Sequence, residues 1–438
     1  MLRVPRDADF LVAASCLALC LGVAGPLRAE KPQPRAPTKS SEISALLKAA
    51  AEALDKNDLP AAVKTLSEVV EKEPGLAAAW FNLGYAHSGL HQDEEAVRAY
   101  QKTLELQPDL FEAHLNLGIL LIQMNRSAES LPHLEKAVAL KPEHARAHLY
   151  YGRALAAAWG TSDAAEEQFE EALKLDAGLA IAHFDLGQLR LGRKDYVNAL
   201  ASFQKAAEAD SKLAQAQLGL ALALEGLNRT PEAVTHFEQY LAATPGDLET
   251  RFHLARVYLQ EGKNQEAFDS LQTVYQGNPQ MPGVAAALGD VCALLKKFAE
   301  SEKYYRQALG ASPNEADLHR ALGQTLLDQE KFADAEAEFR AALKLDPRSR
   351  DAAQGLATSL YLQKRYPEAI PLLEQLSQAP DPPAGLFFVL ATCYDHLRDL
   401  ERAIRNYERF LQMSHNQNPD QEWQAQQRLK PLRRELRK

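Results

Sequence analysis

Histidine side chains are the groups in this sequence whose chemistry would most readily suggest a metal site. Twelve histidines are present, and zinc needs several ligand atoms about 2 Å from one ion. His114, His148, His183 and His319 recur at a regular interval or its multiples, in register with Trp80. Side chains that are a whole structural unit apart cannot share an ion. We therefore expect these histidines to be packing residues and the protein to bind no metal.

Acidic side chains gather in segments 93–95, 166–171 and 333–339. An acid–base pair of carboxyl groups needs a cleft that gives the two groups different environments. These segments instead lie mainly at the start or on the outer face of expected helices, where negative charge near a helix N-terminus is favourable. The sequence has no nucleophile elbow, P-loop or Rossmann glycine pattern. We therefore expect no catalytic residues, no cofactor and no small-molecule substrate.

The elements that carry these residues follow a period of about 34 residues, a length typical of helical repeat units. A Leu-Gly or Leu-Ala pair recurs, as at Leu83-Gly84 and Leu288-Gly289, and an alanine commonly follows twelve positions after the small residue. An aromatic residue or leucine comes four positions later, and proline often closes the unit. Apolar residues at three- and four-residue spacing predict two amphipathic helices per unit, and proline ends the second. No segment shows the alternation of a β-strand, so the expected fold class is all-α.

These positions resemble the tetratricopeptide repeat, which has the same order of aromatic, Leu-Gly, alanine and proline positions and the same period. The match covers residues 43–417 in eleven repeats, which start near 43, 77, 111, 145, 180, 214, 248, 282, 316, 350 and 384. One helix pair cannot bury its apolar face alone, so neighbouring repeats stack. The resemblance implies a right-handed superhelical solenoid in which the first helix of each repeat lines a concave groove.

The resemblance also assigns a surface for binding partners. Its groove positions hold aromatic, aliphatic and arginine side chains in the early and middle repeats: Phe81, Tyr85, Leu115, Ile119, Arg146, Arg153, Phe184, Phe252 and Arg256. The aromatic residues are expected anchors, and the arginines are expected to meet acidic groups of a partner. The alternative is that some of these positions pack against adjacent repeats. The carboxylate clamp of some family members is matched only in part, by Asn116 and Arg146.

The two ends of the chain have their own patterns. Residues 1–29 have the layout of a secretory signal peptide, with two arginines before the apolar run 10–27, and residues 30–42 predict a disordered, proline-rich linker. The expected location is periplasmic or extracellular. The alternatives are a membrane anchor formed by the uncleaved segment or by a lipidated cysteine, with Cys20 as the candidate.

Residues 418–438 predict a C-terminal capping helix over the last open face of the repeats. Trp423, Leu429, Leu432 and Leu436 are expected to form one apolar stripe, and Pro431 is expected to kink or split the helix. Its basic residues solvate the outer side. The alternative is that they contact an acidic partner or a phosphate lipid.

Two pairs of residues carry modification chemistry. Cys292 and Cys393 lie three repeats apart, whereas a disulfide needs Cα atoms within roughly 7 Å, so we expect two free, buried thiols. Asn125 and Asn228 each begin an Asn-X-Ser/Thr triplet in an expected turn between helices. They are acceptors only in a host that glycosylates secreted proteins.

The composition narrows the function classes. Of the 438 residues, 46% are hydrophobic and 25% are charged, which is typical of a folded chain. A net charge of -10 argues against a nucleic-acid binder, which would show a basic face. We expect a non-catalytic protein–protein interaction scaffold that binds proteins or peptide segments along its groove. The alternatives are a cell-envelope assembly factor that self-associates or is membrane-tethered, and an accessory subunit that recruits substrate to a separate enzyme.

Overall fold

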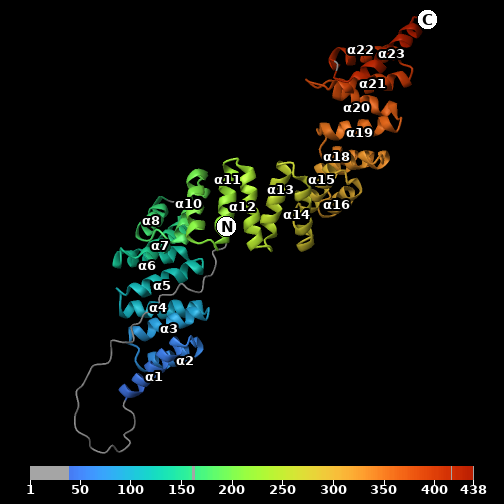
Figure 1. The fold of residues 1–438 in the computed structure, drawn as a ribbon. Helices are drawn as coiled ribbons and strands as arrows, with labels where there is room; N and C mark the ends of the chain where they lie inside the picture. Colours follow the sequence, from blue (N-terminus) through green and yellow to red (C-terminus); the bar gives the residue numbers. More distant parts are fainter. Residues whose placement is uncertain (1–38, 160–162, 416, 438) are drawn as a thin grey trace, which may run out of the picture. The chain divides into compact units, whose positions relative to one another are not determined.

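The structure, a computed structural model, describes residues 39–159, 163–415 and 417–437, and within them it contains helices and no strand (Figure 1). The chain divides into two compact units, which meet between Tyr240 and Leu241. The helices that begin before this boundary, which falls within the last of them, are α1 (Lys39–Asp55), α2 (Leu59–Lys72), α3 (Ala77–Gly89), α4 (Asp93–Leu106), α5 (Phe111–Gln123), α6 (Ser127–Leu140), α7 (Ala145–Trp159), α8 (Asp163–Leu175), α9 (Ala180–Gly192), α10 (Tyr196–Ala209), α11 (Ala214–Gly226) and α12 (Thr230–Ala243).

The second unit continues the same pattern. Its helices are α13 (Leu248–Gln260), α14 (Asn264–Gly277), α15 (Val284–Leu294), α16 (Phe298–Ala311), α17 (Ala316–Asp328), α18 (Phe332–Leu345), α19 (Arg350–Leu362), α20 (Tyr366–Ser377), α21 (Ala384–His396), α22 (Leu400–Ser414) and α23 (Pro419–Leu436). Within each unit, consecutive helices lie side by side in chain order (Figure 1). Helices α1 to α22 form eleven successive pairs, and the expected all-α fold class of repeated helix pairs is confirmed.

A left-handed backbone residue marks the turn inside the helix pairs and makes the period visible in the backbone. Positive φ angles recur at Asn57, His91, Asn125, Lys194, Asn228, Gly262, Lys296, Glu330, Lys364 and Arg398. This geometry lets the next amide bond back to the helix, as where the backbone N–H of Gln92 donates to the His87 carbonyl at 3.0 Å. Asn125 and Asn228, the two glycosylation candidates, occupy this position, and asparagine adopts it more readily than most residues.

The small residue of the Leu-Gly pair allows the two helices of a pair to approach closely. A Cβ atom added at Gly84 would lie 2.9 Å from the ring of Tyr100, and one added at Gly118 would lie 2.5 Å from Leu134. Real Cβ atoms do not approach other heavy atoms so closely. The recurring glycine is therefore required by the large side chain that the second helix places against it.

Trp80 and the histidines in register with it each make the same kind of hydrogen bond. Each side chain donates a ring N–H to the backbone carbonyl six residues earlier, where the preceding helix has ended. The bonds are Trp80 Nε1 to Pro74 O (2.9 Å), His114 Nε2 to Pro108 O (2.8 Å), His148 Nε2 to Pro142 O (2.9 Å), His183 Nε2 to Ala177 O (3.0 Å) and His319 Nε2 to Pro313 O (3.1 Å). The expected packing role of this position is confirmed.

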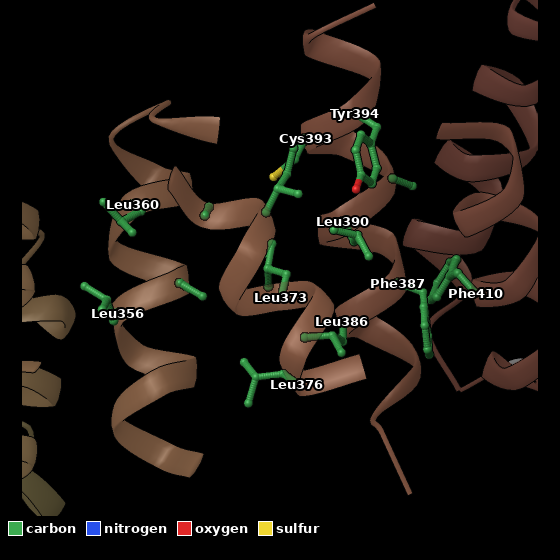
Figure 2. Close-up of a cluster of buried hydrophobic side chains, with 14 of the residues drawn as sticks. Leu356, Leu360, Leu373, Leu376, Leu386, Phe387, Leu390, Cys393, Tyr394 and Phe410 are labelled. Carbon is green, nitrogen blue, oxygen red and sulfur yellow. The ribbon is translucent and has the colours of Figure 1, made fainter. Parts of the chain in front are cut away.

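The core of the last repeats is formed by apolar side chains between consecutive helices (Figure 2). Phe387 of α21 lies beside Phe410 of α22, and Leu390 faces Leu373 of α20. Cys393 belongs to this cluster, while Cys292 is buried in α15, and both are free thiols as expected. Burial raises the pKa of Cys292 to about 11 and that of Cys393 to about 12, so both remain protonated at neutral pH.

The structure corrects the expectations for the linker and for the capping helix. Helix α1 begins at Lys39, so the last four residues of the expected linker 30–42 are helical, because no proline lies between Pro37 and Pro60. The expected signal peptide, residues 1–29, lies outside the described residues. Helix α23 runs through Pro431 as one helix, so the expected split does not occur.

The apolar stripe of α23 is also different from the expected one. Leu429 and Leu432 are buried together with Ala425, whereas Trp423 is 63% exposed and Leu436 is 46% exposed. Positions 425, 429 and 432 share one helical face, and that face packs against the core. Trp423 points away from it, and Leu436 lies at the helix end. Within the described residues, every helix is either too short or too polar to span a lipid bilayer.

Candidate functional site

The nine expected groove residues lie on the first helices of their pairs, α3, α5, α7, α9 and α13. Three of them do not reach the surface. Phe81 is 2% exposed, and its ring meets that of Tyr100 at 5.7 Å. Leu115 and Ile119 are buried in a cluster with Leu134 of α6. These three expected contacts are wrong, because the next first helix covers this position and makes it part of the core.

Arg153 is likewise engaged inside the protein. Its guanidinium pairs with Asp185 of α9, with the two side chains 14% and 15% exposed, and it lies 5.5 Å from the ring of Tyr150. The expected contact of Arg153 with a partner's acidic group is therefore wrong, since the arginine ties two successive repeats together. Phe184 is half-buried and packs on Phe203, with ring centroids 5.7 Å apart.

The partial carboxylate clamp fails for a similar reason. Asn116 is fully buried, so it cannot reach a partner's carboxylate. Arg146 is exposed on α7 and Tyr85 is half-buried on α3. They remain candidates for contact, but they do not line either of the two cavities found below.

The structure brings Phe252 and Arg256 together in a cavity of about 410 Å³ between α13 and α15. Leu259 and Gln260 of α13 extend the same wall. The opposite wall is formed by small or short residues at the start of α15: Gly283, Ala286, Ala287 and Asp290. We call this space the α13–α15 cavity.

The cavity exists because of the residue types at repeated positions. Ala286 stands one full period after Phe252, and Asp290 stands one full period after Arg256, so each pair occupies one position in successive repeats. In the first unit, the position of Phe252 holds Phe81 and Leu115, which are buried, and Phe184, which is half-buried. Here the phenylalanine is followed by an alanine, and its small side chain forms part of the wall opposite the half-buried ring of Phe252.

The two charged side chains of the cavity differ in whether another residue of the protein holds them. Tyr305 donates its hydroxyl proton to Asp290 Oδ1 at 2.6 Å, and burial together with this carboxylate raises the pKa of Tyr305 above its usual range. One oxygen of Asp290 is thereby fixed. Arg256 is exposed and makes no ion pair with any other residue that the structure describes. The cavity thus offers an aromatic wall and an unpaired guanidinium to a ligand.

A second and larger cavity, of about 620 Å³, lies near the C-terminus and was missed by reasoning from the sequence. Helices α19, α21, α22 and α23 line it, with Tyr361, Phe388, Tyr407, Trp423 and Arg428 among the lining residues. The signal in the sequence was Trp423, which lies out of register with Ala425, Leu429 and Leu432. Among the described residues, no group of three histidine, cysteine or carboxylate side chains is arranged to hold a metal ion.

Comparison with known proteins bears on the repeats. Family models described as tetratricopeptide repeat match residues 77–110 and 258–325, and a further one matches 115–180, 160–214, 185–248, 218–282 and 320–385. The last alone covers more than half of the chain. No curated protein matches.

Three similar solved structures illustrate the range of likeness. Yeast Tom70 is 17% identical, with 91% of this chain and 97% of that chain covered and a TM-score of 0.34. The C-terminal part of a TPR repeat-containing protein from Cytophaga hutchinsonii is 15% identical over 55% and 98%, with a TM-score of 0.46. MamA from Desulfovibrio magneticus RS-1 is 24% identical over 40% and 99%, with a TM-score of 0.38.

Proposed function

Because the chain belongs to the tetratricopeptide repeat family and is a protein-interaction scaffold, we propose that it holds a segment of a partner protein in the α13–α15 cavity. The partner segment inserts an apolar side chain against Phe252 and places an acidic group beside Arg256. No step of this binding requires catalysis, a cofactor or a metal ion.

The half-covered ring beside an unpaired guanidinium is the observation that supports this proposal most directly. Aromatic and arginine side chains that become fully desolvated in a complex contribute most of the binding energy at protein interfaces. Phe252 is already half-buried. A partner's side chain therefore removes the rest of the Phe252 ring from water, and the phenylalanine itself loses little conformational freedom. Arg256 makes no ion pair within the described residues, and Asp290, the carboxylate that lines the same cavity, accepts a hydrogen bond from Tyr305.

Two variants test the cavity by different physical means. Ala286→Leu fills the space opposite Phe252 with a good helix former, which blocks the ligand while the fold is retained. Arg256→Glu reverses the charge at an exposed site. Each variant is expected to weaken the partner by at least about ten-fold, the loss typical of a central interface residue.

The matched control is Lys344→Glu, which makes the same change in charge at an exposed position of α18. Partners are first identified by crosslinking and mass spectrometry with the intact chain, and their affinities for the four proteins are then measured by calorimetry. If Ala286→Leu and Arg256→Glu bind every identified partner as tightly as the parent and the Lys344→Glu control, the proposed function is wrong.

We also propose that the protein is exported. Arg3 and Arg6 before the apolar run 10–27, and Ala29 as a small residue for cleavage, support this location. The test is N-terminal sequencing of the protein from its native host. A mature chain that begins at Glu30 is expected, whereas a chain that retains residues 1–29 in the cytoplasmic fraction would contradict export.

A further inference from the structure

We propose that the larger cavity near the C-terminus binds an acidic peptide segment of a partner protein through one aromatic side chain of that segment. This C-terminal cavity is defined by Tyr361, Phe388, Thr392, Tyr407, Trp423 and Arg428. It lies among α19, the last helix pair and the capping helix α23, and it shares no lining residue with the α13–α15 cavity. It is therefore a separate binding site.

The C-terminal cavity arises where the stack of repeats ends. Phe388 occupies the same repeat position as Phe81, which the next first helix covers completely. The helix that follows the last pair is α23, and it places Ala425, Leu429 and Leu432 in the core instead of closing over α21. Phe388 is consequently only half-buried, and it faces a space of about 620 Å³.

Aromatic side chains form the apolar part of this space. Phe388 is held edge-on against Tyr407 at 5.9 Å and against Phe410 at 5.3 Å, so the wall is rigid before any ligand arrives. Trp423 is 63% exposed at the cavity rim. A rigid aromatic wall with an exposed indole fits one aromatic side chain, because aromatic pairs attract one another beyond the effect of area buried.

The charged side chains of the cavity are Asp395 and Arg428, which pair with each other, and Arg398. Arg428 donates from Nε to Asp395 Oδ2 at 2.5 Å and from Nη2 to Oδ1 at 2.9 Å. This bidentate pair fixes the guanidinium and leaves its Nη1 without a hydrogen-bond partner among the described residues. An immobilised arginine with a free N–H is preorganised for a second carboxylate.

The surroundings extend this charge preference. Residues 384–438 carry ten lysines and arginines against seven aspartates and glutamates, although the net charge of the whole chain is -10. A basic end on an acidic chain attracts acidic partners and repels basic ones. The cavity size also suits one large side chain with its neighbours, since ligand pockets commonly measure about 300–1,000 Å³.

An anionic lipid surface would meet the same basic residues, but it would not need the aromatic wall. A flat membrane contacts the outer side of a helix through scattered cations, whereas Phe388, Tyr361 and Arg428 converge on one hollow. The geometry therefore favours the peptide, and vesicles serve as the competing arm of the test.

The test selects ligands from a phage-displayed library of random peptides against the full chain. Peptides with an aromatic residue flanked by aspartate or glutamate are expected to be enriched. Synthetic versions are then titrated into the parent and into Trp423→Ala, which removes an exposed side chain and leaves the core intact. A loss of affinity of at least about ten-fold is expected for this variant.

A matched pair of charge variants separates electrostatic recognition from altered packing. Gln424 lines the cavity and is exposed. Gln424→Lys is expected to strengthen the selected peptides and Gln424→Glu to weaken them, each by roughly two- to five-fold, as for one surface charge. A purely structural role of position 424 would move both variants in the same direction.

Several results would overturn the inference. These are no enrichment above the starting library, enrichment of basic or uncharged peptides, unchanged affinity for Trp423→Ala, or binding to vesicles of anionic phospholipid that survives this substitution. Peptides that lose affinity for Arg256→Glu and Ala286→Leu but not for Trp423→Ala would place binding in the α13–α15 cavity. That outcome would reject the C-terminal site and leave the proposed function standing.

Discussion

Reversing the charge of Arg153 tests the reasoning about the middle repeats most sharply. From the sequence, Arg153 is expected to face a partner, so Arg153→Glu should weaken capture and leave the fold intact. In the structure, Arg153 pairs with Asp185 across two repeats, with the side chains only 14% and 15% exposed. The variant would place two carboxylates together at this junction.

The magnitude follows from the burial of the pair. Breaking a fully buried ion pair by removing one partner costs about 3–5 kcal/mol, because a buried charge is left uncompensated. The small remaining exposure of both side chains allows some solvation. We therefore expect Arg153→Ala to lower the local free energy of opening by about 2–3 kcal/mol. The decrease in this free energy is larger for Arg153→Glu, because the new carboxylate repels that of Asp185. Partner affinity at the α13–α15 cavity is expected to stay unchanged.

The assay measures the local free energy of opening by hydrogen exchange, with urea unfolding as a second probe, since repeat proteins open locally and a single global free energy is not defined for them. Amides of α7 and α9 are expected to lose protection first. The exchanged pair Arg153→Asp with Asp185→Arg restores the opposite charges and should recover a substantial part of the loss. A change below about 0.5 kcal/mol, the range of an ordinary surface substitution, would refute the inference that this pair joins the repeats.

Two further predictions concern packing and ionisation. Gly355→Ala places a Cβ atom well inside van der Waals contact of the buried Phe339 ring and is expected to lower thermal stability by about 1–3 kcal/mol. Gly310→Ala in α16, where no heavy atom lies within 4 Å, should raise it by up to about 1 kcal/mol; equal effects would contradict the packing argument. The pKa values of Cys292 and Cys393 are raised from 9.0 to about 11 and about 12, so their contribution to stability is complete below about pH 9 and is lost as the pH rises through the folded values. Alkylation by iodoacetamide at about pH 8, below both folded pKa values, should therefore require unfolding, and rapid alkylation of the native protein would disprove the burial of these thiols.

The helix pairs were predictable because their signals are local. A glycine at Gly84 is needed because a large side chain, Tyr100, packs against it from the second helix, and both partners belong to one repeat. The ring N–H of Trp80 bonds to a carbonyl only six residues earlier, and His114 repeats this contact. Patterns of this kind recur in the sequence with the period of the structure, so periodicity was sufficient to identify them.

The groove residues were not predictable in the same way. Phe81, Phe252 and Phe388 are the same residue type at the same repeat position, yet the first is buried and the other two face cavities. The difference comes from the following element, which covers Phe81 but leaves Phe252 opposite Ala286 and Phe388 beside α23. The charge of Arg153 was visible in the sequence, but its pairing with Asp185 depends on how two repeats meet.

The sequence by itself therefore determined the all-α class, the period and the packing role of the recurring histidines, because each rests on contacts within one repeat or between residues six positions apart. Only the tertiary structure decided which aromatic side chains are open, which arginines are free and where the cavities lie. The physical reason is that the exposure of a side chain is set by the residues that pack around it. A side chain's access to a partner depends on the volume and charge of residues that another repeat, or the capping helix, places against it.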